Sequence, residues 1–193
     1  AYAAHYAKHG GIYYDDHEDK VIGEDVTRTN RFLAVAINVE NEIRTAGREL
    51  RILDYGCAHG HYMMPLAKAF PDCRFTGVDV SERAIAAATK WAIRDQITNV
   101  ELRLGNQDVL KDVSTLCPLV YDEDSIQFDG NVADAKKARR DLFDVIIAGE
   151  VVEHVPDWLQ LLEDFRNVLK PGGLLIVTTP YGRWEWSGTE AFR

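Results

Sequence analysis

The sequence has few of the features that mark secreted, membrane-spanning or nucleic-acid-binding proteins. Its three cysteines, at positions 57, 73 and 117, form no CxxC pair and are odd in number, which argues against a disulfide framework. No apolar run approaches the ~18 to 20 residues of a membrane span, and no signal peptide opens the chain. We therefore expect a protein of the reducing cytoplasm.

Positive charge is also scarce, because 22 lysines and arginines stand against 31 aspartates and glutamates, giving a net charge of −9. Proteins hold phosphate backbones with clustered Lys and Arg, so this composition argues against nucleic acid as a partner. It leaves a small cationic ligand open. The chain begins at Ala1 without an initiator Met and stops at Arg193 soon after a strand-like run. We therefore expect it to be part of a longer polypeptide.

Short apolar runs alternate with helical patterns along the chain. Strands are predicted at 51–57, 74–80, 99–106, 143–151 and 174–180, and helices at 24–45, 60–70, 81–96 and 156–170. Ser81 is the expected N-cap of the third helix, with Ile85 on its apolar face, and "KPGG" is expected to end the fourth helix. Single helices between strands predict an α/β fold, a doubly wound and mostly parallel sheet with helices on both faces. We expect the sheet to be truncated after the fifth strand.

The predicted domain organisation has two parts. Residues 1–46 form an N-terminal helical cap segment, and residues 47–193 form a cofactor-binding domain with an insertion at about 107–142. An insertion of this length is either a solvated loop or a functional element.

The stretch "ILDYGCAHGHY" (52–62) allows two interpretations. Cys57, His59 and His61 resemble metal ligands, but C-x-H-x-H lacks a fourth partner nearby, whereas zinc sites usually take paired ligands from two segments. Gly56 and Gly60 instead form a G-x-x-x-G loop at the carboxyl end of the first predicted strand, where doubly wound sheets bind their ligands. The cofactor loop is the favoured interpretation.

Polar residues at three successive strand ends suit one cofactor. Asp54 precedes the loop and would repel a dinucleotide pyrophosphate, but it suits S-adenosylmethionine, which carries an ammonium and a sulfonium group. Asp79 ends the second strand and can accept hydrogen bonds from ribose hydroxyls. In "GNQD" after the third strand, Asn106 or Asp108 could recognise the adenine amino group.

Together, "ILDYGCAHG", "FTGVDVSERAI", "FDVIIAGEVVEHV" and "LKPGGLLIVTTP" resemble the motifs of class I S-adenosylmethionine-dependent methyltransferases, which have a Rossmann-like fold. The resemblance implies that Asp54 and Gly56 hold the methionine end of the cofactor, Asp79 the ribose, and Asn106 or Asp108 the adenine. Ala58 replaces a glycine common in the family, and we expect it to be tolerated with a negative φ. The remaining candidate cofactor-binding positions are Cys57, Gly60, Val80, Gln107 and Glu150.

The stretch "GEVVEHV" carries the candidate chemistry. Glu150, Glu153 and His154 could bind a divalent cation (Mg, Mn or Zn), or could simply orient the loop and contact the cofactor. The segment resembles the E-x-x-E-H motif that is associated with metal in ubiquinone-pathway O-methyltransferases and small-RNA 2′-O-methyltransferases. His154 is the candidate base for the acceptor's proton, and Glu150 is the second candidate catalytic residue.

Aromatic side chains near both ends of the chain are candidates for a substrate wall. Plain packing is an equal alternative for Tyr13 and Tyr14, whereas substrate contact is favoured for Tyr181, Trp184 and Trp186. The sequence thus predicts a methyltransferase acting on a small molecule, with O-methylation of a hydroxylated metabolite or sugar favoured. Two alternatives remain. One is a methyltransferase-like cofactor-binding module with a regulatory or scaffolding role in a larger protein. The other, weakened by Asp54, is an NAD-dependent dehydrogenase.

Overall fold

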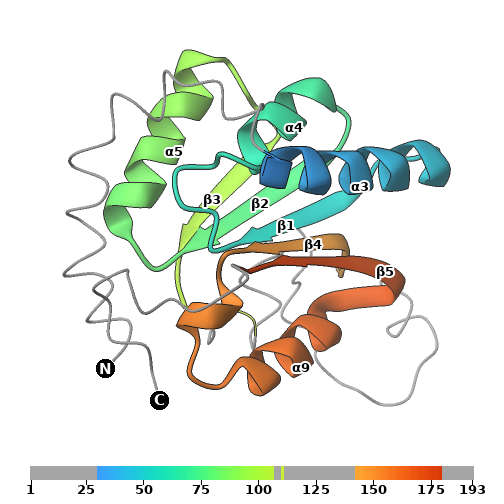
Figure 1. Ribbon diagram of the computed structural model, residues 1–193. Coiled ribbons are helices and arrows are strands. Elements are labelled where there is room, and N and C mark those ends of the chain that lie inside the picture. The colour runs from blue at the N-terminus through green and yellow to red at the C-terminus, as the bar shows by residue number, and fades with distance from the viewer. Residues whose placement is uncertain (1–29, 107–109, 111–141, 180–193) are drawn as a thin grey trace, which may run out of the picture.

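A five-stranded sheet forms the centre of the protein in the computed structural model, which describes residues 30–106, 110 and 142–179 (Figure 1). The strands are β1 (Arg51–Tyr55), β2 (Arg74–Asp79), β3 (Val100–Leu104), β4 (Phe143–Gly149) and β5 (Leu169–Thr178). Their order is β3-β2-β1-β4-β5 and every pair is parallel. The predicted α/β, doubly wound parallel fold is confirmed.

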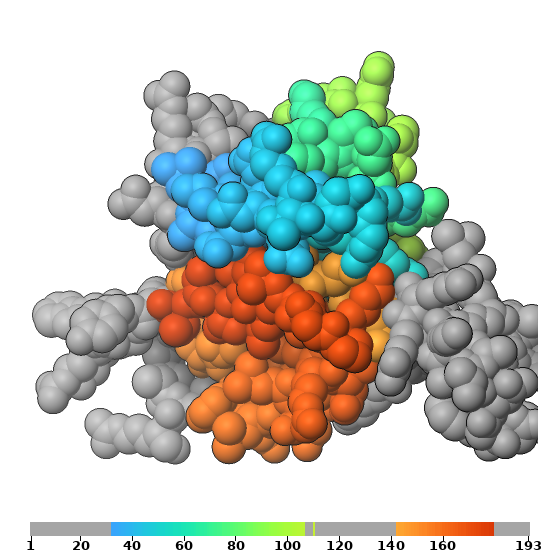
Figure 2. All heavy atoms as spheres, turned by 90° about the vertical axis from the view of Figure 1, so that its right-hand side faces the viewer, coloured from blue at the N-terminus to red at the C-terminus, as the bar shows by residue number. Residues whose placement is uncertain are grey.

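Helices cover both faces of the sheet. Figure 1 shows α3 (Asn30–Ala46), α4 (Met63–Ala69) and α5 (Glu82–Arg94) on one face and α9 (Trp158–Val168) on the other. The short 3₁₀ helix η3 (Val152–His154) links β4 to α9. Figure 2, seen from the right-hand side of Figure 1, shows α3 in blue lying directly on β5 in red.

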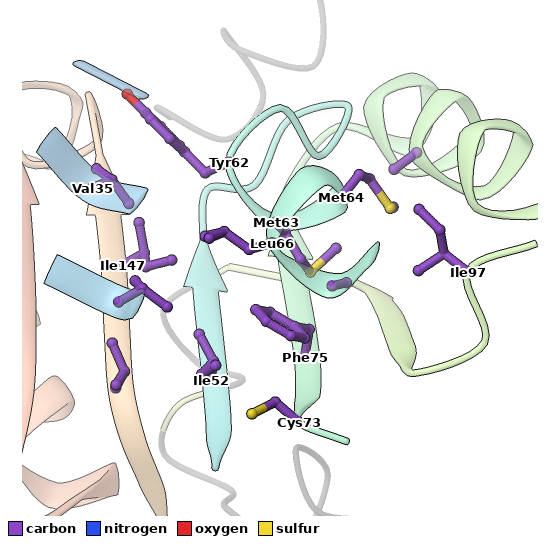
Figure 3. Packing of buried hydrophobic residues seen from close by; sticks show 14 of the residues in the cluster. Val35, Ile52, Tyr62, Met63, Met64, Leu66, Cys73, Phe75, Ile97 and Ile147 are labelled. Atoms are coloured by element: carbon purple, nitrogen blue, oxygen red, sulfur yellow. The ribbon is translucent and has the colours of Figure 1, made fainter. Parts of the chain in front are cut away.

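Each face has its own hydrophobic core. Under α3, α4 and α5, Val35, Ile52, Met63 and Phe75 pack together, with Tyr62 at the carboxyl end of the sheet (Figure 3). Under α9, Leu161 and Phe165 pack against the other face of β1 and β4. β4 is buried along its whole length, as expected for a central parallel strand.

The predicted helix boundaries need several corrections. Residues 58–62 are turns and α4 begins only at Met63, so Pro65 lies in its first turn, where its missing N–H costs no hydrogen bond. α3 begins at Asn30 rather than at 24. Ser81 does cap α5, its hydroxyl accepting from Ala84 N, but Ile85 is only half-buried because the helix turns Trp91 and four alanines toward the core.

The end of α9 also differs from the prediction. Trp158 does not belong to the buried stripe, since it is 49% exposed at the first helical position. "KPGG" follows the helix as part of β5 rather than as a separate stop, because Leu169 already pairs with Phe143. The pairing then shifts before Leu174 joins Val145, so the extra residues form an irregularity within the strand pair.

The amino-terminal edge of the sheet is held by one buried carboxylate. Asp144 in β4 accepts hydrogen bonds from Arg48 Nη2 at 2.6 Å, from Arg51 N at 2.9 Å and from Lys170 Nζ at 2.9 Å. These contacts join the segment after α3 to the starts of β1, β4 and β5. Burial raises the pKa of Asp144, but these donors outweigh it and hold the pKa below its ordinary value.

The described residues include α3 but almost none of the predicted insertion. Phe32, Val35 and Val39 of α3 are buried in the same core as β1, whereas the predicted insertion at 107–142 lies almost entirely outside the described residues. Within the part of the chain that the structure describes, no helix is both long and apolar enough to cross a membrane.

Candidate active site

The candidate site lies where the parallel strands end, on the left-hand side of the sheet in Figure 1. The loop after β1 is fastened to β2 there, because the backbone N–H groups of Gly56 and Cys57 both donate to Val78 O, at 2.7 and 3.0 Å. Gly56 has a φ of +71°, and a Cβ at this position would lie 2.4 Å from Val151 Cγ2. Only glycine combines this conformation with such close contact.

Ala58 departs from the sequence expectation. Its φ is +49° rather than negative, so an L-residue occupies the left-handed region in the middle of the loop. The conformation aims the Ala58 N–H at Asp79 Oδ2, 2.8 Å away. The expected negative φ was wrong, because the path of the loop between β1 and α4 determines the dihedral angles of Ala58 and overrides the ordinary preference of an L-residue.

Asp54 is the most unusual polar group of the site. It is 1% exposed, and neither carboxylate oxygen has a hydrogen-bond partner within the described residues. Burial, and then the charge of Asp79, raise the pKa of Asp54 to about 8. The N–H of Met63 lowers this pKa in part, although its geometry falls short of a hydrogen bond. A carboxylate in such surroundings is stabilised by a cationic ligand.

Asp79, at the end of β2, is buried but well bonded. Its two oxygens accept from the backbone N–H groups of Ala58 and Ser81, each at 2.8 Å. Burial raises the pKa of Asp79, and these backbone donors limit the rise. Val80 follows at half-burial, and Asn106 is exposed just beyond β3. Asp108, the alternative adenine contact, and Gln107, another predicted cofactor-binding residue, lie outside the described residues.

Cys57 and Gly60 are placed for packing. The Cys57 side chain is fully buried, and a Cβ at Gly77 would lie 2.9 Å from its Sγ. At Gly60 a Cβ would lie 2.8 Å from Met64 Cγ. Both residues therefore fit the loop closely to β2 and α4.

The two histidines of the loop form part of a row of aromatic rings. His59 stacks on Trp91 with ring centroids 6.5 Å apart, and His61 lies 5.3 Å from His59 and 4.1 Å from Tyr62. Burial lowers the pKa of His59, so the neutral ring is favoured. Tyr62 in turn covers Gly149 at the end of β4, where a Cβ would meet its ring at 2.4 Å. This row of aromatic rings supports the loop after β1.

The segment after β4 turns sharply at Glu150, which has a φ of +57° and donates its N–H to Thr178 O at 2.8 Å. Glu153 and His154 follow in η3, with His154 Nε2 3.9 Å from Glu153 Oε1. Burial raises the pKa of Glu153, and a hydrogen bond with the Thr179 side chain opposes the rise. The three predicted residues thus lie together at this edge of the sheet.

The predicted cation site is not supported by the residues described. Among residues 30–106, 110 and 142–179, no group of three or more His, Cys, Asp or Glu side chains is arranged to hold a metal ion. This applies both to Glu150, Glu153 and His154 and to the alternative grouping of Cys57, His59 and His61. The predicted substrate residues lie outside the described residues; they are Tyr13, Tyr14, Tyr181, Trp184 and Trp186.

Sequence reasoning missed two threonines at the end of β5. Thr178 accepts the Glu150 N–H through its carbonyl, and its hydroxyl is buried without a hydrogen-bond partner within the described residues. The Thr179 side chain lies close enough to Glu153 to lower the pKa of that carboxyl. The signal was the polar pair "TT" closing an otherwise apolar strand, at the edge where β1, β2 and β4 also end.

The chain is similar to known proteins over most of its length. A family model described as "Methyltransferase domain" matches residues 27–190. The chain belongs to this family. The ubiquinone biosynthesis O-methyltransferase of Cereibacter sphaeroides strain ATCC 17029 is 32% identical over 130 residues, which cover 67% of this chain and 41% of that protein. This methyltransferase-family chain therefore spans about two fifths of the length of the curated relatives it matches.

Solved structures agree on the fold. WbdD in its monomeric form has a TM-score of 0.55 and 20% identity, covering 82% of this chain and 32% of that one. A sarcosine dimethylglycine methyltransferase from Galdieria sulphuraria, described as putative, has a TM-score of 0.53 and 17% identity, covering 76% and 47%. The resemblance to class I S-adenosylmethionine-dependent methyltransferases is thus confirmed for the family and its fold.

Proposed function

We propose that the chain is the cofactor-binding and catalytic part of an S-adenosylmethionine-dependent methyltransferase that methylates a hydroxyl oxygen of a small molecule. The observation that carries the proposal is the buried Asp54 carboxylate. It has no hydrogen-bond partner within the described residues, and it lies in β1 one residue before the end of the strand. Membership of the methyltransferase family supports the same cofactor.

The residues present fit this cofactor. Asp54 offers negative charge to an ammonium or sulfonium group, and Asp79 keeps lone pairs free to accept from ribose hydroxyls, because each carboxylate oxygen can accept more than one hydrogen bond. The proposed adenine contact falls to Asn106 or Asp108. Bound S-adenosylmethionine would supply an electrophilic methyl group. A pyrophosphate would meet the Asp54 carboxylate as a like charge, which disfavours NAD.

The protein's own contribution is positioning and removal of a proton. A hydroxyl of ordinary pKa must be deprotonated before or during attack on a methyl group, and His154 is the proposed base. Its backbone N–H donates to Val151 O at 2.9 Å, which fixes it in η3. Glu150, held in its left-handed turn by Thr178, is proposed to orient the acceptor beside the donor.

Oxygen is the favoured acceptor atom because the curated relatives are named as O-methyltransferases. The net charge of −9 favours a small molecule over nucleic acid.

Calorimetry tests the cofactor directly. S-adenosylmethionine, S-adenosylhomocysteine and NAD are titrated separately into the metal-stripped chain, then again with Mg²⁺, Mn²⁺ or Zn²⁺. We expect both adenosyl ligands to bind, with affinity about 10- to 100-fold weaker in Asp79→Ala, the loss of hydrogen bonds to a charged group. Asp72→Ala, on the exposed turn before β2, is the matched control and should bind normally.

The outcomes separate the alternatives. Binding of NAD in place of the adenosyl ligands would refute the proposal. Adenosyl binding without methyl transfer to any of a panel of phenols and alcohols would favour the regulatory module. If transfer occurs, His154→Gln should lower kcat while leaving cofactor affinity unchanged.

A further inference from the structure

The two central strands separate before they end. In the described sheet, β1 pairs with β2 as far as Tyr55, and β4 pairs with β5 as far as Gly149. The pairing between β1 and β4 stops earlier, at Asp54 and Ile147. The strand order reverses at the same place, because β2 and β3 lie on one side of β1 while β4 and β5 lie on the other. Ligands of parallel sheets bind at such a point, so the loop after β1 and the segment after β4 diverge where the cofactor is expected.

Two side-chain contacts join the diverging segments beyond the last strand pairs. Val151, after β4, lies so close to Gly56, after β1, that a Cβ on this glycine would clash with Val151 Cγ2. Tyr62, from the segment after β1, lies as close to Gly149 at the end of β4. In Figure 3 the Tyr62 ring reaches from beyond the tip of β1 toward β4. Each segment thus places a large side chain on a glycine of the other, and we call this pair the crossed contacts.

The crossed contacts lie on opposite faces of the sheet. Tyr62 belongs to the core under α3, α4 and α5, whereas Val151 packs against the core under α9. The three atoms nearest to a Cβ at Gly56 all belong to Val151, and those nearest to a Cβ at Gly149 all belong to Tyr62. A displacement of one segment toward either face of the sheet therefore meets one of these two side chains.

Val151 is also bonded to the proposed base. Its carbonyl accepts the His154 N–H at 2.9 Å, and η3 begins at the next residue. On the other side of the contact, the Gly56 N–H donates to Val78 O at 2.7 Å and so fastens the cofactor loop to β2. The Val151 side chain therefore links the position of η3 to that of the cofactor loop. A misplacement of about 1 Å between reacting groups can cost about 100-fold in rate.

We propose that Val151 and Tyr62 are positioning residues, which hold the segment that carries His154 in a fixed relation to the cofactor loop by contacting Gly56 and Gly149. The inference rests on the proposed function and goes beyond it, because neither residue needs to touch the methyl donor or the acceptor. It also implies that a ligand bound at the cofactor loop stabilises η3 through the crossed contacts.

Native-state hydrogen exchange, followed by NMR, tests the inference without turnover. The Cys57 N–H, which donates to Val78 O, reports on the cofactor loop, and the His154 N–H reports on η3. In the unmodified chain, saturating S-adenosylhomocysteine should slow exchange of both amides by at least about tenfold. In Val151→Ala the ligand should still slow exchange at Cys57 by this factor, but at His154 by less than about twofold.

The free protein provides a second readout. Without ligand, Val151→Ala should speed exchange of both amides about tenfold, because the loss of apolar contact loosens both segments. Val151→Thr keeps the branched shape and should restore both rates to within about threefold. Val100→Ala is the matched control, because Val100 is a half-buried valine that packs against the core from β3, and both amides should keep their rates.

Kinetics add a measure of the positioning itself. With any compound that the unmodified chain methylates, Val151→Ala should lower kcat about 10- to 100-fold while the affinity for S-adenosylmethionine stays within about threefold. If Val151→Ala fails to fold, Tyr62→Leu removes the contact on the other face, and the same loss of ligand-induced protection at His154 is expected.

Unchanged protection of the His154 amide in Val151→Ala would overturn the inference and leave the proposed function intact, because the ligand would still bind. No binding of S-adenosylhomocysteine to the unmodified chain would refute the proposed function instead. The exchange rates of the free protein then decide the crossed contacts. Faster exchange of both amides in Val151→Ala would support them, and faster exchange of only one amide would overturn them.

Discussion

At the scale of single residues, the site contains groups that are costly in the free protein. Asp54 is a buried carboxyl without a hydrogen bond inside the described residues, and Ala58 and Glu150 have left-handed backbone conformations. Such features persist where the surrounding structure imposes them, and they concentrate at functional sites. A single substitution can remove each of these unfavourable features. The effect of that substitution on stability should then differ from its effect on ligand binding.

We predict that Asp54→Asn stabilises the free protein and abolishes binding of S-adenosylhomocysteine. The folded pKa of about 8 lies above the unfolded value, so the folded state retains a proton that the unfolded state releases. Stability therefore falls as pH rises from about 4 to 8, and Asn removes this loss. At pH 8 we expect a gain of at least about 1 kcal/mol, or roughly 2–4 °C in Tm.

Thermal melts of both proteins from pH 5 to 9 test this, and the gap between them should widen with pH. Some slope should remain in the variant, because burial raises the pKa of Asp79 as well. A constant gap would show that Asp54 does not hold a proton in the folded protein.

Ala58→Gly should stabilise the protein by about 0.5–1 kcal/mol. A left-handed L-residue costs roughly 1–2 kcal/mol, and the greater chain entropy of glycine in the unfolded state offsets part of this gain. The matched control is Ala86→Gly on the exposed side of α5, which should destabilise by about 1 kcal/mol. Urea titrations that give the same sign for both would contradict the strained conformation.

At the scale of elements, the two ends of the sheet carry different kinds of interaction. The amino-terminal edge is tied by the ion pairs of Asp144 with Arg48 and Lys170. The carboxyl-terminal edge carries the buried polar groups of the candidate site. Because β1, β4 and β5 run through both edges, the rigidity of one end fixes the positions of residues at the other.

Asp144→Ala should therefore destabilise the protein by about 2–4 kcal/mol, since Lys170 loses its partner while remaining largely buried. The stability that Asp144 contributes is present above about pH 4 and is lost as pH falls below it, because its folded pKa is lowered. Glu163→Ala is the control, because its pair with Arg166 is exposed and should be worth less than about 0.5 kcal/mol. Equal losses in denaturant titrations would contradict a structural role for the Asp144 cluster.

At the scale of the whole molecule, the sequence predicted the sheet well, and it predicted which candidate residues lie at the ends of the strands. Strand positions followed from apolar runs bounded by turn residues, and Asp54 and Asp79 followed from the rule that ligands meet strand ends. The dihedral angles of Ala58 and Glu150 could not be predicted, because they depend on how the loops after β1 and β4 join their neighbours.

Cofactor binding should raise the stability of the whole chain in a pH-dependent way. At 100 times its Kd, S-adenosylhomocysteine should add about 2.7 kcal/mol, or roughly 5–10 °C in Tm. The increase should be larger at pH 8 than at pH 6, because at pH 6 a cationic ligand must first displace the proton on Asp54. Adenosine, which lacks the amino-acid part, is the control and should show no such dependence. A larger shift at pH 6 would refute the linkage.

The order β3-β2-β1-β4-β5 has one more consequence. The chain leaves one margin of the described sheet at Leu104 and re-enters beyond β1 at Phe143, so this crossing is the longest connection between consecutive described strands. The entropy of closing such a loop grows only with the logarithm of its length, and doubling it costs roughly 0.6 kcal/mol. Insertions in this crossing are thus thermodynamically cheap, which makes it the place where related chains can diverge in length while keeping the same sheet.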